Sequence, residues 1–187
     1  MLDKPKRITV KQPKEFLRLK IGMFGDAAVG KTSIVTRYTT NTFTMSYNPT
    51  VAVDYQNKVV ETSDYNINLN LFDFSGHPEF FDVRTEFYKD INAILLIFDL
   101  THKRSLESLD SWVKEIEENA GLLKELKLPV FVIGNKKDVG GVGGVGGLGG
   151  SRARMWGAEY REVSASEEGG GVEEMMSDVV KKCMEGG

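Results

Sequence analysis

Apolar and polar positions follow a regular pattern along most of the chain, and the period changes from one segment to the next. Every second position is apolar over residues 17–23, which predicts a strand with one buried face. Residues 34–38 then carry apolar side chains at helical spacing. Residues 93–100 (AILLIFDL) form a continuous apolar run, which is typical of a strand covered on both faces.

The same alternation of strand and helix patterns continues to the end of the chain. Further strands are expected at residues 55–61, 66–73, 130–134 and 160–163, and further helices at residues 106–116 and 172–184. Segments that alternate in this way predict an α/β domain with a mostly parallel central sheet and helices on both faces.

Two segments lack this periodicity. Residues 1–15 are basic and contain two prolines, so we expect a flexible N-terminal extension ahead of a folded domain at 16–187. Residues 140–150 (GGVGGVGGLGG) are dense in glycine, which destabilises helix and strand through backbone entropy. We therefore expect this tract to be a flexible surface loop.

Composition narrows the class of protein. The chain has 187 residues, which suits one domain, and its net charge of -3 gives no electrostatic reason to expect a nucleic-acid partner. No apolar run approaches membrane-spanning length. Cys183 is the single cysteine, so a disulfide framework or a multi-thiolate metal site is excluded. We expect a cytoplasmic monomer.

One motif stands between the first predicted strand and the first predicted helix. Residues 25–32 (GDAAVGKT) match the phosphate-cradle pattern G-x-x-x-x-G-K-[ST], in which glycines let the backbone N–H groups face phosphate oxygens. Alone, the pattern is also compatible with a glycine-rich turn that has no function. The expected phosphate-binding residues are Gly25, Asp26, Ala28, Val29, Gly30, Lys31, Thr32 and Ser33.

Two later segments supply groups for a magnesium ion beside the phosphates. Thr32 is the first expected ligand, and Thr50, in the polar loop Asn48-Pro49-Thr50, adds a hydroxyl when a third phosphate is present. Asp73 ends an apolar strand, where its carboxylate can hold the ion through water. Gly76 can offer its N–H to the third phosphate.

A third segment, Asn135-Lys136-Lys137-Asp138, directly follows a predicted buried strand and indicates a guanine site. The Asp138 carboxylate can accept hydrogen bonds from guanine N1–H and from its exocyclic amine, a donor pair that adenine lacks. The Lys136 stem can lie along the base, and Asn135 can connect this loop to the cradle.

Two weaker signals complete the base site. The triplet Ser164-Ala165-Ser166 follows the last predicted strand, and the N–H of Ala165 is a candidate donor to the guanine carbonyl. Phe43 lies in the loop after the first helix, where it either packs against the base or belongs to the core.

Together these motifs resemble those of the Ras superfamily of small GTPases, over about residues 16–184. The pattern at 47–55 is similar to that of Rab proteins, and the segments 76–84 (GHPEFFDVR) and 86–90 resemble the RJL branch, Rab-like proteins some of which carry a C-terminal J domain. The sequence contains no His-Pro-Asp J-domain signature, so we expect either a member without that domain or a truncated chain.

The resemblance implies a P-loop NTPase of the small G-domain type that acts as a guanine-nucleotide switch. GTP or GDP and Mg²⁺ are the implied cofactors, and effector proteins are expected to bind through the two switch loops. The RJL resemblance also implies a link to the cilium, flagellum or basal body. Rab-type prenylation is not expected, because Cys183 is followed by four residues and has no second cysteine beside it.

The chain departs from the family pattern at the hydrolytic position. Active Ras-like enzymes are similar in placing a Gln after the D-x-x-G glycine, where it orients water, but this chain has His77 followed by Pro78. Proline pushes the preceding residue towards extended geometry. We therefore expect His77 to be an exposed loop residue without a catalytic part. Ala27, where many members have glycine, crowds the third phosphate.

Three functions remain open on these residues. The first is a switch that hydrolyses GTP very slowly by itself, and the second is a turnover GTPase whose partner orients His77 or donates an arginine. The third, an ATP-dependent kinase, is disfavoured by residues 135–138. Four aromatic residues near the second switch either form an effector surface or pack on a neighbouring helix: Phe74, Phe80, Phe81 and Phe87.

Overall fold

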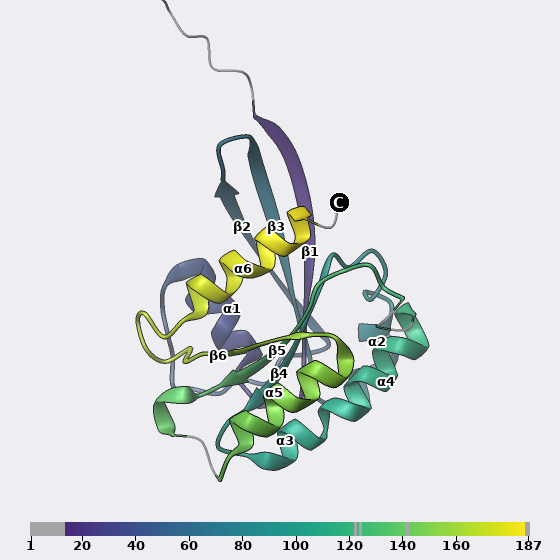
Figure 1. Cartoon of the computed structure of the whole chain (residues 1–187), viewed down its shortest axis with the longest axis vertical. Helices are drawn as coiled ribbons and strands as arrows, with labels where there is room; N and C mark the ends of the chain where they lie inside the picture. Colours follow the sequence, from purple (N-terminus) through teal and green to yellow (C-terminus); the bar gives the residue numbers. More distant parts are fainter. Residues whose placement is uncertain (1–13, 122, 124, 141–142, 186–187) are drawn as a thin grey trace, which may run out of the picture.

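The computed structural model describes residues 14–121, 123, 125–140 and 143–185, and these form a single twisted sheet with helices on both faces (Figure 1). The strand order is β2-β3-β1-β4-β5-β6, with β2 and β3 antiparallel and every other neighbouring pair parallel. The predicted α/β fold with a mostly parallel sheet is confirmed. The strands are β1 (Glu15–Phe24), β2 (Val53–Glu61), β3 (Tyr65–Phe74), β4 (Ala93–Asp99), β5 (Val130–Asn135) and β6 (Glu159–Glu162).

The helices form two layers, one on each face of the sheet. The apolar residues of α1 and α6 share one hydrophobic core with β1 and β3, whereas those of α4 and α5 belong to a second core on the other face. The helical segments are α1 (Lys31–Thr40), α2 (Phe81–Thr85), α3 (Lys103–Glu107), α4 (Leu109–Ala120), α5 (Val145–Trp156) and α6 (Val172–Glu185), with short 3₁₀ turns η1 (Pro78–Phe80) and η2 (Lys137–Val139).

The sequence pattern explains how these layers form. All seven residues of β4 are buried, as its continuous apolar run predicts for a central strand with both faces covered. In β3 every second residue from Ile67 to Leu71 is fully buried against the layer of α1 and α6. The three longest strands, β1, β2 and β3, extend beyond the rest of the sheet (Figure 1).

Several predicted strand boundaries differ from the observed ones by one or two residues, and two differences change the description of the chain. β1 begins at Glu15, inside the predicted extension, and residues 1–13 of that extension lie outside the described residues. The expected helix at 106–116 is divided between α3 and α4, which are separated by Ser108. The apolar residues still share one face, because all of them pack in the second core.

The prediction for the glycine-rich tract is wrong for residues 145–150, which form the first half of helix α5. Tertiary packing outweighs the poor helix propensity of glycine here. Val145 is 2% exposed, and a Cβ added at Gly149 would lie only 2.8 Å from Cζ of Phe98 and 2.9 Å from Cε2 of Tyr160. The missing side chain lets α5 approach the sheet closely.

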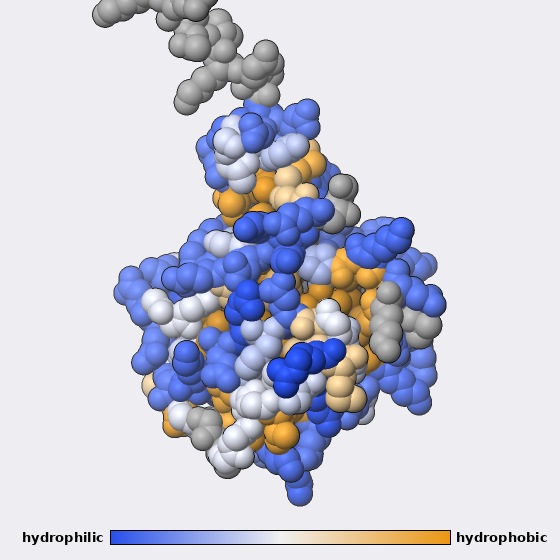
Figure 2. Space-filling model, in the orientation of Figure 1, coloured by the Kyte–Doolittle hydropathy of each residue, from blue (hydrophilic) through white to orange (hydrophobic). Residues whose placement is uncertain are grey.

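Hydrophilic residues cover much of the face seen in Figure 2, with smaller hydrophobic patches between them. Within the described part of the chain, none of the helices has both the length and the apolar composition that a membrane crossing requires.

Candidate functional site

The sheet topology brings the predicted site residues to one edge. β1 lies between β3 and β4, so the strand order reverses there, and in open α/β sheets ligands bind outside the carboxyl ends of strands at such a point. The loops after β1, β3, β5 and β6 all leave from this edge. β2 is antiparallel to β3, so the loop before it reaches the same edge.

The cradle at residues 25–30 turns sharply from β1 into α1. Gly25 and Gly30 have φ values of 141° and 96°, which side chains with a Cβ rarely adopt, so both glycines are required by the backbone. Ala28 is also left-handed, with φ of 63°. The turn ends at the N-terminus of α1, whose unpaired N–H groups favour an anion.

Lys31 is buried at the base of the cradle, with 5% of its surface exposed. Its Nζ donates to the carbonyl oxygens of Gly25 and Asp26, each at 2.8 Å. Burial lowers the pKa of Lys31 to about 8, although the nearby Asp73 and Asp26 carboxylates act in the opposite direction. The ammonium group is thus held by backbone atoms at the position where an anion would be neutralised.

The three predicted magnesium ligands lie together beside the cradle. Thr50 Oγ1 is 3.1 Å from Thr32 Oγ1 and donates to Asp73 Oδ2 at 3.0 Å, and Thr32 also donates to that oxygen. The other carboxylate oxygen, Asp73 Oδ1, is buried and has no hydrogen-bond partner among the described residues. Two hydroxyls and a carboxylate with a free oxygen fit a hard cation such as Mg²⁺.

Burial raises the pKa of Asp73, and the nearby Lys31 and the two threonine hydroxyls only partly offset this effect. A cation at this position would favour the ionised carboxylate in the same way as Lys31 does.

The segment after β3 (residues 75–88), which is the second of the two expected switch loops, packs directly on the cradle. A Cβ added at Gly76 would lie 2.1 Å from the backbone N of Ala27, so the two chains are in close contact. His77 has φ of −88° and ψ of 131°, which confirms the extended geometry predicted from Pro78.

The expectation that His77 is exposed is wrong. The residue is half-buried and lines the same pocket as the cradle. Within the described part of the chain, its Nε2 is buried without a hydrogen-bond partner. The backbone at this position is fixed by one contact, because the His77 carbonyl accepts a 2.7 Å hydrogen bond from Nη1 of the buried Arg84.

Arg84 is the centre of a buried polar cluster that joins α2 to α4. It is 4% exposed, and its Nε and Nη2 donate to the two carboxylate oxygens of Glu115 at 2.7 and 2.6 Å. Tyr88 donates to the same carboxylate, and the guanidinium lies 4.6 Å from the ring centroid of Trp112. Trp112 Nε1 in turn donates to Asp26 Oδ1 of the cradle at 2.9 Å.

The predicted connection between the base loop and the cradle is present. Asn135 is 1% exposed, and its Nδ2 donates to the Val29 carbonyl at 2.9 Å. Its Oδ1 accepts a 3.2 Å hydrogen bond from the Ala165 N–H. That N–H was expected to be free for a guanine carbonyl, but in this structure Asn135 is its acceptor.

Asp138 is exposed at the entrance of the pocket, where Ser164 Oγ donates to its Oδ1 at 2.6 Å. Ser166 Oγ lies 2.9 Å from Ser164 Oγ and extends this hydroxyl pair. Partial burial acts against ionisation, but the hydrogen bonds from Ser164 and Ser166 outweigh it and hold the pKa of Asp138 below its usual value. Asp138 is therefore an ionised hydrogen-bond acceptor.

The cradle, both switch segments and the base loops line one pocket of about 660 Å³. This volume is within the range of sites for small molecules and cofactors. Phe43 is 38% exposed and lines the pocket, so its alternative placement in the core is wrong.

Of the four aromatic residues near the second switch, Phe74 is in the core, whereas Phe81 and Phe87 are each 39% exposed.

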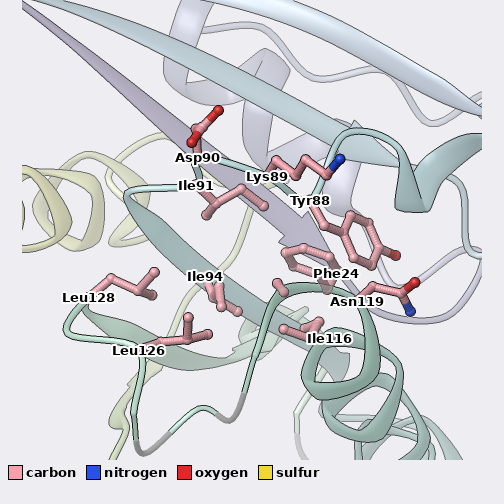
Figure 3. A pocket seen from close by; sticks show the side chains of 11 residues that line it. Phe24, Tyr88, Lys89, Asp90, Ile91, Ile94, Ile116, Asn119, Leu126 and Leu128 are labelled. Atoms are coloured by element: carbon pink, nitrogen blue, oxygen red, sulfur yellow. The ribbon is translucent and has the colours of Figure 1, made fainter.

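A second pocket, of about 280 Å³, lies between the start of β4 and the end of α4 (Figure 3). Apolar side chains, among them Phe24, Ile94 and Ile116, line it, and the figure shows Asp90 pointing away from them. It shares no lining residue with the larger pocket.

Several residues of the site carry no motif and were not predicted. Asp99 ends β4 and pairs with Lys136 at 2.6 Å, and its place at the end of a buried strand was an available signal. Arg37 of α1 donates to the carbonyls of Ala165 and Ser166, a contact without a signal in the sequence. Arg84 was likewise missed.

Comparison with known proteins agrees with this arrangement. The Ras family model matches residues 20–185. The curated relatives include "DnaJ homolog subfamily C member 27" from Rattus norvegicus, 37% identical over 192 residues that cover 98% of this chain and 68% of the relative. The human protein of the same name is 36% identical with the same coverage. "DnaJ homolog subfamily C member 27-A" from Xenopus laevis is 37% identical over 186 residues, 95% of this chain and 67% of the relative.

Proposed function

The chain belongs to the Ras family of small GTPases, and we propose that it is a Rab-like guanine-nucleotide switch that binds GTP and GDP with Mg²⁺ and hydrolyses GTP very slowly by itself. The observation that carries this proposal is the position of Asn135. Its side chain joins the cradle at Val29 to the base loop at Ala165, so the phosphate half and the base half form one pocket.

The base is selected by Asp138. Its ionised carboxylate can accept from the two donors on one edge of guanine, whereas adenine offers no such pair. The hydroxyl of Ser164 occupies one lone pair of Oδ1 and fixes the orientation of the carboxylate. Phe43 lies at the wall of the same pocket and supplies an apolar contact for the base.

The phosphates are bound by the cradle N–H groups, the N-terminus of α1 and Lys31. Thr32 and Thr50 would hold Mg²⁺ directly and Asp73 through water, and the bound ion would neutralise charge on the terminal phosphates. Thr50 gains its full set of contacts with the third phosphate, so we infer that the loop before β2 responds to the nucleotide state.

Slow hydrolysis follows from the second switch segment. The extended backbone of His77 and the hydrogen bond from Arg84 to its carbonyl fix the segment, which restricts how the imidazole can orient water. A second candidate is partner-activated turnover, and one observation favours it. His77 lines the pocket, and its Nε2 has no hydrogen-bond partner among the residues that the structure describes. Either function has an effector surface, which is supplied by Phe81, Phe87 and the exposed loop before β2 (residues 42–51), the first of the two switch loops.

Nucleotide competition tests the proposal. We expect GTP and GDP, but not ATP, to displace a fluorescent guanine nucleotide in magnesium buffer. Asp138→Asn should shift the preference from guanine to xanthine nucleotides by about 100-fold, because the amide pairs a donor with an acceptor. Asp110→Asn, at an exposed carboxylate of α4, is the matched control and should leave the preference unchanged. Equal competition by ATP would contradict the proposal.

A further inference from the structure

Arg37 lies in the last turn of α1 and contacts the loop after β6. Its Nε donates to the Ala165 carbonyl and its Nη2 to the Ser166 carbonyl, each at 3.0 Å. Its Nη1 donates to the backbone and side-chain oxygens of Asn41 at 2.9 and 3.2 Å. In Figure 1 this loop lies beside α1, so the contact joins neighbouring parts of the molecule that are 128 residues apart in sequence.

The guanidinium is suited to this contact because it is planar and its donors have a fixed geometry. Two consecutive carbonyls accept hydrogen bonds from the two donors on one edge of the guanidinium, Nε and Nη2. This fixes the orientation of the peptide between them as well as its distance from the helix. That peptide joins Ala165 to Ser166. The Ala165 N–H donates to Asn135, and Ser166 Oγ belongs to the hydroxyl pair beside Asp138.

Helix α1 therefore acts at both ends of the pocket. Its first turn presents Lys31 and Thr32 at the cradle, and its last turn holds the base loop through Arg37. The two turns are separated by six residues, about 9 Å along the helix axis. Because a ten-residue helix is stiff over that distance, a contact at one end sets the position of the base loop relative to the phosphates.

We propose that Arg37 is a positioning residue for guanine recognition, which sets how long the nucleotide stays bound by orienting the Ala165–Ser166 backbone. This inference rests on the proposed function, because it assigns a role within the same pocket. Arg37 does not line that pocket, so its action passes through the loop that it holds.

Dissociation of a fluorescent GDP analogue tests the role directly. In Arg37→Ala the loop loses two charge-assisted hydrogen bonds, which water replaces in part, and GDP should dissociate about tenfold faster. Arg37→Lys keeps the charge but cannot donate to both carbonyls with fixed geometry, so GDP should dissociate from this variant about threefold faster than from the unmodified protein. Arg18→Ala, an exposed arginine of β1, is the matched control and should match the unmodified protein.

Binding of magnesium tripolyphosphate, followed by NMR titration, separates positioning from general damage to α1. This ligand has no base, so both Arg37 variants should bind it like the unmodified protein. An equal loss of affinity for GDP and for tripolyphosphate would overturn the inference. GDP dissociation from both variants at a rate within twofold of the unmodified protein would also overturn it. If Arg37→Ala does not fold, Arg37→Lys carries the test.

The failure of the proposed function has a different signature. In that case the unmodified protein would not prefer GDP to ADP. If the unmodified protein prefers GDP but both Arg37 variants release GDP at the unmodified rate, only the role of Arg37 is overturned.

Discussion

The two loops that border the phosphate cradle are attached to the protein in different ways. The first loop (residues 42–51) has no regular secondary structure, and Met45 and Val51 in it are 92% and 72% exposed. The second loop (residues 75–88) contains η1 and α2, and it is joined to α4 by the buried pair of Arg84 and Glu115.

The two loops also differ in whether their attachment involves groups that are proposed to bind the nucleotide and its metal ion. Thr50 attaches the first loop to Thr32 and Asp73, the groups proposed to hold Mg²⁺. The second loop is attached by Arg84 to its own backbone and to Glu115, and these groups lie outside the proposed ligand set. Under the proposed function, a third phosphate would add contacts to the first loop, whereas the second loop is held by protein contacts alone.

The largest effect is expected when the attachment of the second loop is removed. Glu115→Ala leaves the buried guanidinium of Arg84 without its carboxylate, and the free energy of unfolding should fall by about 3 kcal/mol. Urea denaturation with unchanged m-value measures this fall. Glu118→Ala, an exposed position of the same helix that pairs with Lys114, should cost less than about 0.5 kcal/mol. Similar costs for both variants would contradict a special role of the pair.

The attachment of the first loop is tested through the nucleotide. Thr50→Ala removes the proposed third-phosphate contact, so GTP affinity should fall about tenfold, while GDP affinity stays within about twofold. Calorimetric titration with GDP and with a non-hydrolysable GTP analogue measures both. Thr42→Ala removes another hydroxyl of the same loop, which contacts Thr40, and serves as the control. An equal loss of affinity for GDP and for the GTP analogue in Thr50→Ala would contradict the switch role of Thr50.

The rate of GTP hydrolysis tests whether the fixed backbone of the second loop prevents residue 77 from orienting water. His77→Gln alone should raise the single-turnover rate of preloaded GTP less than about threefold, because Pro78 and Arg84 still fix the backbone. His77→Gln combined with Pro78→Ala should raise it at least about tenfold. An unmodified protein that hydrolyses GTP as fast as a Gln-bearing small GTPase, without a partner, would contradict slow intrinsic hydrolysis.

The smallest effect concerns the link between the second loop cluster and the cradle. Trp112→Phe keeps an aromatic ring beside Arg84 but removes the hydrogen bond to Asp26, which should cost about 1 kcal/mol of unfolding free energy. Trp156→Phe, a half-buried tryptophan of α5, controls for the loss of ring size. A larger cost at Trp156 than at Trp112 would show that the hydrogen bond contributes little.

Features encoded by neighbouring residues could be predicted from the sequence. The cradle is contiguous, and its glycines adopt the positive φ values that its turn requires. The buried run of β4 and the extended backbone of His77 likewise depend on local rules.

Features that depend on distant residues could not be predicted in this way. The orientation of the loop after β6 depends on Arg37, which is 128 residues away from Ala165 in the sequence. α5 was missed because intrinsic propensity gave the wrong answer at Gly149, where packing on Phe98 and Tyr160 decides the structure. A single sequence contains no signal for such pairs.

Helix α5 also bears on the order in which the chain folds. It contains four glycines among twelve residues, and each costs about 1 kcal/mol relative to alanine, so the segment has little tendency to form a helix alone. Its partners Phe98 and Tyr160 belong to β4 and β6 and must be in place before α5 can dock. We infer that α5 docks late in folding. Asn135 to Asp138, the guanine-site segment that precedes α5, would then take its final shape after the cradle. A newly made chain should become competent to hold phosphate before it can distinguish guanine from adenine.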